Sequence, residues 1–121
     1  MYPAFLQLHY LDQIYYTLAE INIIEKDTIS AIENYTLSTK YSVENDIQKS
    51  LAFLQTGKIY YKQSEYPISK MFYDSAYTFM PETHQLYNNT KENQKILENL
   101  VNHLNTILLE DSLQKLASMT E

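Results

Sequence analysis

The scarcity of glycine restricts the fold of this 121-residue chain more than any other feature of the sequence. The chain contains only one glycine, Gly57. The tight turns that join neighbouring β-strands rely largely on glycine, because it accepts positive φ angles without steric cost. Valine, one of the residues that strands favour, occurs only at positions 43 and 101. A chain so poor in the residues that strands and their turns favour is predicted to be all-α.

The charge balance excludes one broad class of partner. The chain has nine basic residues, all of them lysine, and fifteen acidic residues, which together give a net charge of −6. Arginine is the usual bidentate reader of phosphates and guanine bases, and nucleic-acid interfaces are normally basic. We therefore expect no nucleic-acid partner. The hydrophobic content of 45% and the length predict one globular domain over residues 1–121.

Cysteine is absent from the chain. Disulfides, zinc sites with thiolate ligands and thiol nucleophiles are therefore excluded. No apolar run reaches the roughly 18 residues that indicate a membrane span. The first residues also lack the basic and then apolar pattern of a secretory signal. These observations predict a cytoplasmic location and no contact with a membrane.

Apolar residues recur every three or four positions along most of the chain, which is the spacing of one helix face. The first segment shows this spacing at Leu6, Tyr10, Ile14, Leu18 and Ile21, which places these residues on one face of a helix. Short connections predict that consecutive helices are antiparallel neighbours. The expected helices begin at Pro3, after N-caps at Asp27, Ser42 and Ser64, and at Pro81, and they span 3–24, 28–40, 43–62, 66–80 and 81–119, with a break or kink at 110–112.

Residues 50–83 carry aromatic and small residues in a distinctive order. These are Phe53, Thr56, Gly57, Tyr60, Tyr66, Ser69, Tyr73, Ala76 and Pro81. The order resembles the tetratricopeptide repeat, a helical hairpin with the pattern W-x2-L-G-x2-Y, then A-x3-F, then a closing proline. The only glycine and one proline fall on their family positions, whereas Thr56 and Ser69 depart from the pattern. The resemblance implies antiparallel hairpins stacked as a short solenoid that binds partners and does not catalyse reactions.

Residues 12–45 repeat this pattern more weakly, with alanine at both small positions. Thirty-eight residues separate Tyr35 from its counterpart Tyr73. Residues 84–119 have the length of a third hairpin but no motif, so we expect a degenerate repeat or a C-terminal capping helix there. In each hairpin the small residues allow close helix contact, and Gly57 is expected where its two helices are closest.

No combination of residues indicates catalysis. His9, His84 and His103 lie far apart, and no two of them share the spacing of a metal-binding helix. One glycine cannot form a phosphate-cradling loop, a dinucleotide fingerprint or a nucleophile elbow. We therefore expect a protein that is not an enzyme and needs no cofactor or metal ion. An enzyme with dispersed catalytic residues is the least favoured alternative.

Two pairs of adjacent tyrosines, Tyr15-Tyr16 and Tyr60-Tyr61, point to a binding surface. Neighbours on a helix face directions about 100° apart, so Tyr16 and Tyr61 face away from the core if Tyr15 and Tyr60 face it. In the repeat that this chain resembles, that side of the first helices lines a concave groove. The resemblance implies a groove lined by Tyr16, Glu20, Leu54, Lys58, Tyr61, Lys62, Asn88 and Glu92.

The lysines beside Tyr61 favour a protein or peptide ligand that combines acidic or carboxyl-terminal character with an apolar anchor. Such a module would serve as an adaptor, a chaperone or a regulator. The composition, rich in tyrosine, lysine and asparagine, is also similar to the repeat regions of peptide-sensing regulators from Gram-positive bacteria.

A structural or self-associating domain is the alternative from a different functional class. The apolar stripe from Ile96 to Leu108, with Leu113 and Leu116 beyond it, has to be covered. The stripe is expected either to fold back as a cap or to form a homodimer through the C-terminal helix.

Overall fold

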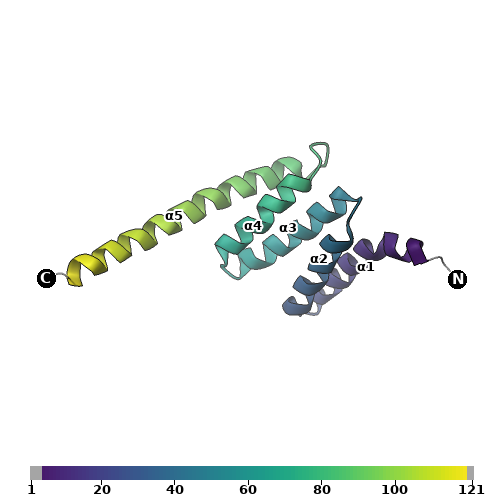
Figure 1. The fold of residues 1–121 in the computed structure, drawn as a ribbon, viewed down its shortest axis with the longest axis horizontal. Coiled ribbons are helices and arrows are strands. Elements are labelled where there is room, and N and C mark those ends of the chain that lie inside the picture. The colour runs from purple at the N-terminus through teal and green to yellow at the C-terminus, as the bar shows by residue number, and fades with distance from the viewer. Residues whose placement is uncertain (1–3, 120–121) are drawn as a thin grey trace.

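The computed structural model describes the backbone of residues 4–119 and the side chains of residues 10–119. Within this range the chain forms five helices and no strand, which confirms the all-α prediction. The helices are α1 (Ala4–Ile24), α2 (Thr28–Tyr41), α3 (Asp46–Lys62), α4 (Tyr66–Phe79) and α5 (Tyr87–Met119), as Figure 1 shows. The predictions for Leu6 and His9 fall outside the described side chains, and Pro3 lies outside the described backbone.

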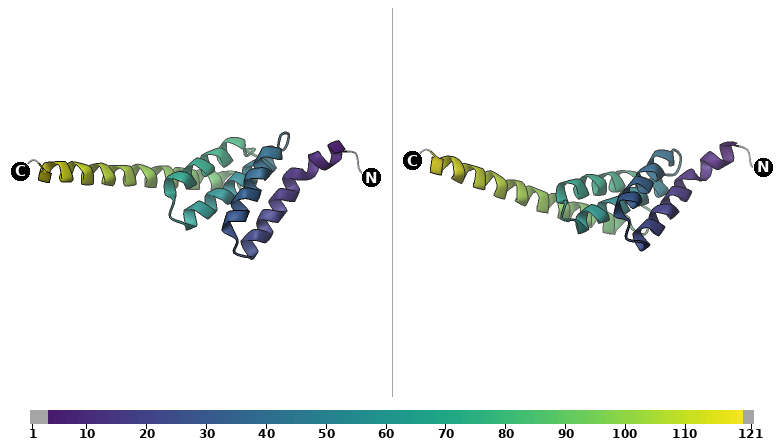
Figure 2. Two further views of the ribbon diagram at one scale, coloured as in Figure 1. Left: turned by 60° about the horizontal axis from the view of Figure 1, so that its bottom comes forward. Right: turned by 90° about the horizontal axis from the view of Figure 1, so that it is seen from below.

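The helices form two antiparallel hairpins, α1–α2 and α3–α4, followed by the long helix α5. Each helix packs on the next along the chain, so the second hairpin stacks on the first through α2 and α3. The N-terminal half of α5 covers α4, and its C-terminal half extends away from the hairpins (Figures 1 and 2). The predicted stacking of hairpins with a C-terminal helix as a cap is therefore confirmed.

The starts of α2 and α3 are set by local hydrogen bonds. Asp27 caps α2 as predicted, because its carboxylate accepts a bond of 3.2 Å from a backbone N–H in the first turn. The predicted caps Ser42 and Ser64 are wrong. Asn45 caps α3, whereas the buried Ser42 donates its hydroxyl to a carbonyl within α2. Ser64 lies in the α3–α4 turn with a φ of 61°.

The predictions for both the start and the break of α5 are also wrong. The chain after Pro81 makes turns, in which the His84 ring nitrogen accepts the backbone N–H of Leu86 at 3.1 Å, and α5 begins only at Tyr87. It then continues without interruption through residues 110–112 to Met119. Glutamate, aspartate and serine keep their backbone N–H groups and cost little inside a helix, unlike proline.

Two clusters of buried residues form the core. The first joins α1, α2 and α3 around Ala19, Ala31 and Tyr35, and the second joins α3, α4 and α5 around Tyr73 and Leu97. The small residues lie at the contacts between the helices of each hairpin, where a larger side chain would hold the helices apart.

Gly57 lies in a tight contact between α3 and α4, in keeping with the prediction. A Cβ atom at this position would lie 2.8 Å from Cδ2 of the Tyr73 ring. The Ser69 hydroxyl donates a hydrogen bond of 2.8 Å to the Gly57 carbonyl, which is accessible because no side chain covers it. The glycine is therefore required by packing rather than by its backbone angles.

The apolar face predicted for the first helix exists on α1 but is not buried. Tyr10, Ile14, Leu18 and Ile21 are exposed, and Ala19 on another side of the helix is buried instead. The corresponding face of α3 is covered by α2, whereas among the described residues no helix packs on this face of α1. The apolar spacing identified a face correctly and could not show whether a neighbour covers it.

Candidate binding groove

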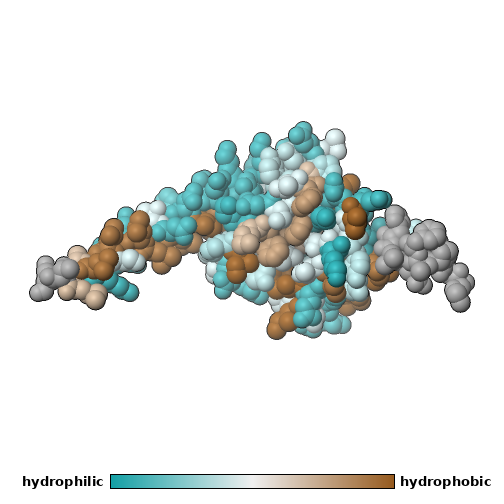
Figure 3. Space-filling model, in the orientation of Figure 1, coloured by the Kyte–Doolittle hydropathy of each residue, from teal (hydrophilic) through white to brown (hydrophobic). Residues whose placement is uncertain are grey.

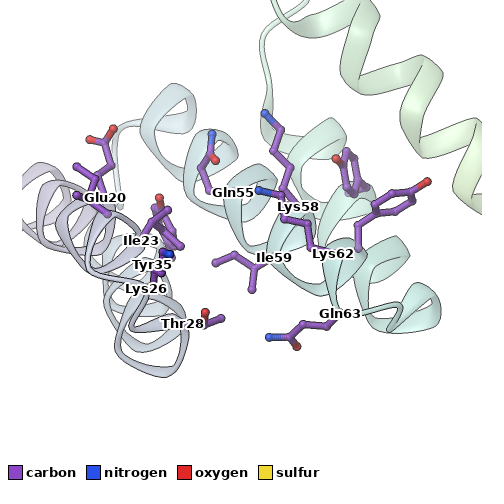
Figure 4. A pocket seen from close by; sticks show the side chains of 13 residues that line it. Glu20, Ile23, Lys26, Thr28, Tyr35, Gln55, Lys58, Ile59, Lys62 and Gln63 are labelled. Atoms are coloured by element: carbon purple, nitrogen blue, oxygen red, sulfur yellow. The ribbon is translucent and has the colours of Figure 1, made fainter.

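A groove of about 650 Å³ opens between the two hairpins, on the side formed by α1 and α3. Figure 4 shows side chains from both hairpins facing this space. Its lining residues are Glu20, Ile23, Ile24, Lys26, Thr28, Tyr35, Gln55, Lys58, Ile59, Tyr61, Lys62, Gln63 and Tyr73.

The groove exists because the two hairpins meet mainly through α2 and α3. Helices α1 and α3 touch only slightly, which leaves a space between them. Tyr35 from α2 and Ile59 from α3 are both buried and close the bottom of this space. The floor therefore belongs to the hydrophobic core, so it is held rigidly by the packing of both hairpins.

Half of the predicted site residues line the groove: Glu20, Lys58, Tyr61 and Lys62. Tyr16 is partly buried and packs edge-on against Tyr35, with ring centroids 5.3 Å apart. Leu54 is buried in the second core cluster and is not presented to the groove. Asn88 and Glu92 are exposed on α5 and do not line this space.

The sequence contained a signal for two of the missed residues. Ile23 and Ile24 lie thirty-eight residues before Tyr61 and Lys62, so they hold the same positions in the first hairpin as two predicted groove residues hold in the second. Both isoleucines line the groove opposite α3. The pairs of adjacent tyrosines predicted the groove residues less well than the repeat offset does. The offset relates Tyr16 to Leu54, which is buried, and neither residue lines the groove. No comparable signal marked Gln55 or Gln63.

The groove has a mixed but mainly positive charge. Lys26, Lys58 and Lys62 border it, and Glu20 is its single acidic residue. Within the described part of the chain, the one ion pair joins Lys70 to Asp74, so these three lysines are not paired. A cluster of unpaired lysines on a protein with a net charge of −6 attracts anionic groups at this position.

Tyr35 and Tyr73 of the groove, and Tyr16 beside it, are held in their neutral form. Burial, and then the nearby Tyr16 and Glu20, raise the pKa of Tyr35 well above its ordinary value of 10.0. Burial and the Glu20 carboxylate also raise the pKa of Tyr16, whereas a hydrogen bond with Gln55 opposes them. Burial, and then Tyr61, raise the pKa of Tyr73. These phenols act as neutral packing and hydrogen-bonding groups at any physiological pH.

The fold is expected to lose stability as the pH rises above about 10. Phenols of the unfolded chain ionise there, while the raised pKa of Tyr35 keeps its proton in the folded state. The free energy of unfolding should then fall by about 1.4 kcal/mol per pH unit for each such proton. Tyr35→Phe removes one of these protons. Denaturant unfolding at several pH values between about 9 and 11 should therefore show that the free energy of unfolding falls less steeply with pH in this variant than in the wild type. Equal slopes for both proteins would contradict the assignment.

The side chains of the groove offer apolar contacts, hydrogen bonds and positive charge to a ligand. The groove offers lysine, glutamine, tyrosine and isoleucine side chains, but no activated nucleophile beside a general base. Among the described residues no cluster of histidine, aspartate and glutamate could hold a metal ion. In the same part of the chain, none of the helices combines the length and apolar character needed to cross a bilayer.

Comparison with known proteins gives no further guide. Neither the protein-family models nor the curated proteins include a match to this chain.

Proposed function

We propose that this chain is a tetratricopeptide-like binding module that holds a segment of a partner protein in the groove between its hairpins. The observation that carries the proposal is the combination of the exposed Tyr61, unpaired lysines and an apolar floor in one space. The module has no catalytic role and serves as an adaptor, chaperone or regulator.

The apolar part of the groove provides the anchor site. Ile23, Ile24 and Ile59 face the space from two hairpins, and Tyr61 stands at its edge with 47% of its surface exposed. Tyr61 is supported from one side by the Tyr66 ring, whose centroid lies 5.4 Å away in an edge-on arrangement. A tyrosine fixed in this way contributes contact area at little cost in conformational entropy.

The charged part of the groove selects the ligand. Lys58 and Lys62 lie one helical turn apart on α3, on the same side as Tyr61. Lys26 adds a third positive charge from the α1–α2 loop. A peptide with an apolar residue flanked by acidic residues, or by its own terminal carboxylate, complements this arrangement.

Binding by such peptides is expected to depend on Tyr61. A library of random displayed peptides selected on the wild-type chain should yield an apolar anchor beside acidic residues. Titration of a selected peptide should show that Tyr61→Ala raises the dissociation constant by about 10- to 30-fold, as loss of a contact aromatic commonly does. Lys58→Ala with Lys62→Ala should weaken binding and reduce its dependence on salt.

Lys91→Ala is the matched control, because Lys91 is exposed on α5 and does not line the groove. It should leave the affinity unchanged, and circular dichroism should show that all the variants remain folded. Selection of no common motif, or equal affinity of the wild type and Tyr61→Ala, would refute the proposed function.

A further inference from the structure

Helix α1 carries an apolar surface that the groove does not use. We call it the α1 outer face; it consists of Ile14, Leu18 and Ile21, with Tyr10 beside them. Tyr10, Ile14 and Leu18, with Gln13 and Thr17 between them, surround a shallow depression of about 450 Å³. A depression among residues spaced three and four apart is the shape that receives a side chain from a second helix.

The internal repeat indicates what kind of element covers such a face. The offset of thirty-eight residues relates Ile14 and Leu18 to Ala52 and Thr56 of α3. Ala52 and Thr56 are buried, because α2 of the preceding hairpin packs on α3. Leu18 has 42% of its surface exposed and Thr56 only 2%, although they hold the same place in their hairpins. The α1 outer face is therefore the site for a helix in the place that α2 takes on α3.

At the other end of the molecule, the C-terminal part of α5 packs on no other described helix. All side chains of residues 105–119, which we call the α5 tail, are exposed, because α5 is much longer than α4. The tail projects from the hairpins, and apolar side chains gather along it in Figure 3. An isolated helix of about 15 residues is only marginally stable in water, so the tail gains stability by packing on another surface.

The apolar side of the tail does not continue the side of α5 that contacts α4. Leu97 and Leu104 lie on the side that packs, and beyond the exposed Leu108 the same side becomes polar at Asp111 and Lys115. Leu109, Leu113 and Leu116 instead form a stripe at spacings of four and three, about two fifths of a turn away around the helix. The tail is thus a separate amphipathic helix suited to a different surface.

We propose that the α5 tail of one copy packs on the α1 outer face of a second copy, in the place that α2 takes on α3. Among the described residues, the α5 tail packs on no other helix, and no helix covers the α1 outer face. They lie at opposite ends of the molecule, with the tail directed away from α1 (Figures 1 and 2), so they cannot meet within one copy. The stripe of Leu109, Leu113 and Leu116 would enter the depression around Ile14 and Leu18.

The test measures mass against concentration by sedimentation or light scattering. The wild-type chain should self-associate, either as a reciprocal dimer or as an open chain of copies. Leu18→Lys and Leu113→Lys should each weaken association by at least about 10-fold, because each places a charge in the same apolar contact. Met71→Lys is the matched control, since Met71 is an exposed apolar residue of α4 outside both surfaces, and it should associate as the wild type does.

A mixture of the two defective variants identifies the pairing. Leu18→Lys retains an intact tail and Leu113→Lys retains an intact α1 outer face, so together they should form a mixed dimer through one sound contact. Three results would overturn the proposal: a monomeric wild type at every soluble concentration, full association of either variant alone, or no mixed dimer. Full association of Leu18→Lys would show that tails pair with each other, and full association of Leu113→Lys would show that α1 faces do.

Discussion

Replacing Leu97 by alanine is expected to lower the free energy of unfolding by about 2–5 kcal/mol. Leu97 has only 2% of its surface exposed and fills the space between α5 and the second hairpin, against Leu54, Tyr73 and Met80. Its removal loses the free energy of transfer of the side chain and leaves a cavity. Because α5 contacts α4 with only its N-terminal half, the loss should also loosen the whole helix. Denaturant unfolding and the helical signal in circular dichroism measure these effects.

Leu116→Ala provides a control with the same chemical change in the same helix. Leu116 has 59% of its surface exposed and contacts no hairpin, so this variant should keep its stability at concentrations where the chain is monomeric. A similar loss for both variants would mean that the tail, and not the contact at Leu97, determines how α5 is held.

Replacing Gly57 by leucine is expected to cost about 3 kcal/mol, at the upper end of the usual effect of overpacking. The first added carbon would already lie 2.8 Å from the Tyr73 ring, and Phe72 closes the other side at 3.4 Å. Neither ring can move freely, because Tyr73 is buried and Phe72 stacks on Tyr60 with centroids 5.5 Å apart. Any separation of the helices would also strain the hydrogen bond from Ser69.

A graded series tests this prediction. Gly57→Ala gains up to about 1 kcal/mol of helix propensity, which opposes the steric cost, so its stability should fall less than that of Gly57→Leu. Lys62→Leu, at an exposed position of the same helix, should be nearly neutral. Unchanged melting of Gly57→Leu would show that α3 and α4 are not held at the distance described.

The candidate groove was only partly predictable from the sequence. Lys58, Tyr61 and Lys62 were expected from the resemblance to the tetratricopeptide repeat, in which this side of the first helix faces a groove, and all three line the groove here. Tyr35 could not be recognised as a groove residue, because the sequence had already assigned it to the core. In the structure it belongs to the core and also lines the groove. A residue can close the bottom of a groove only where two hairpins diverge, and that divergence is not a property of any single helix.

The sequence by itself determined the first four helices and the pairing within each hairpin. Their spacing, the Asp27 cap and the small residues at Ala19, Ala31 and Gly57 act over short distances, so local sterics and hydrogen bonding suffice. The tertiary structure alone decided which apolar faces are buried. Ile14 and Leu18 have the spacing of a core face and are exposed, because burial requires a neighbouring helix and helical periodicity says nothing about whether one is present.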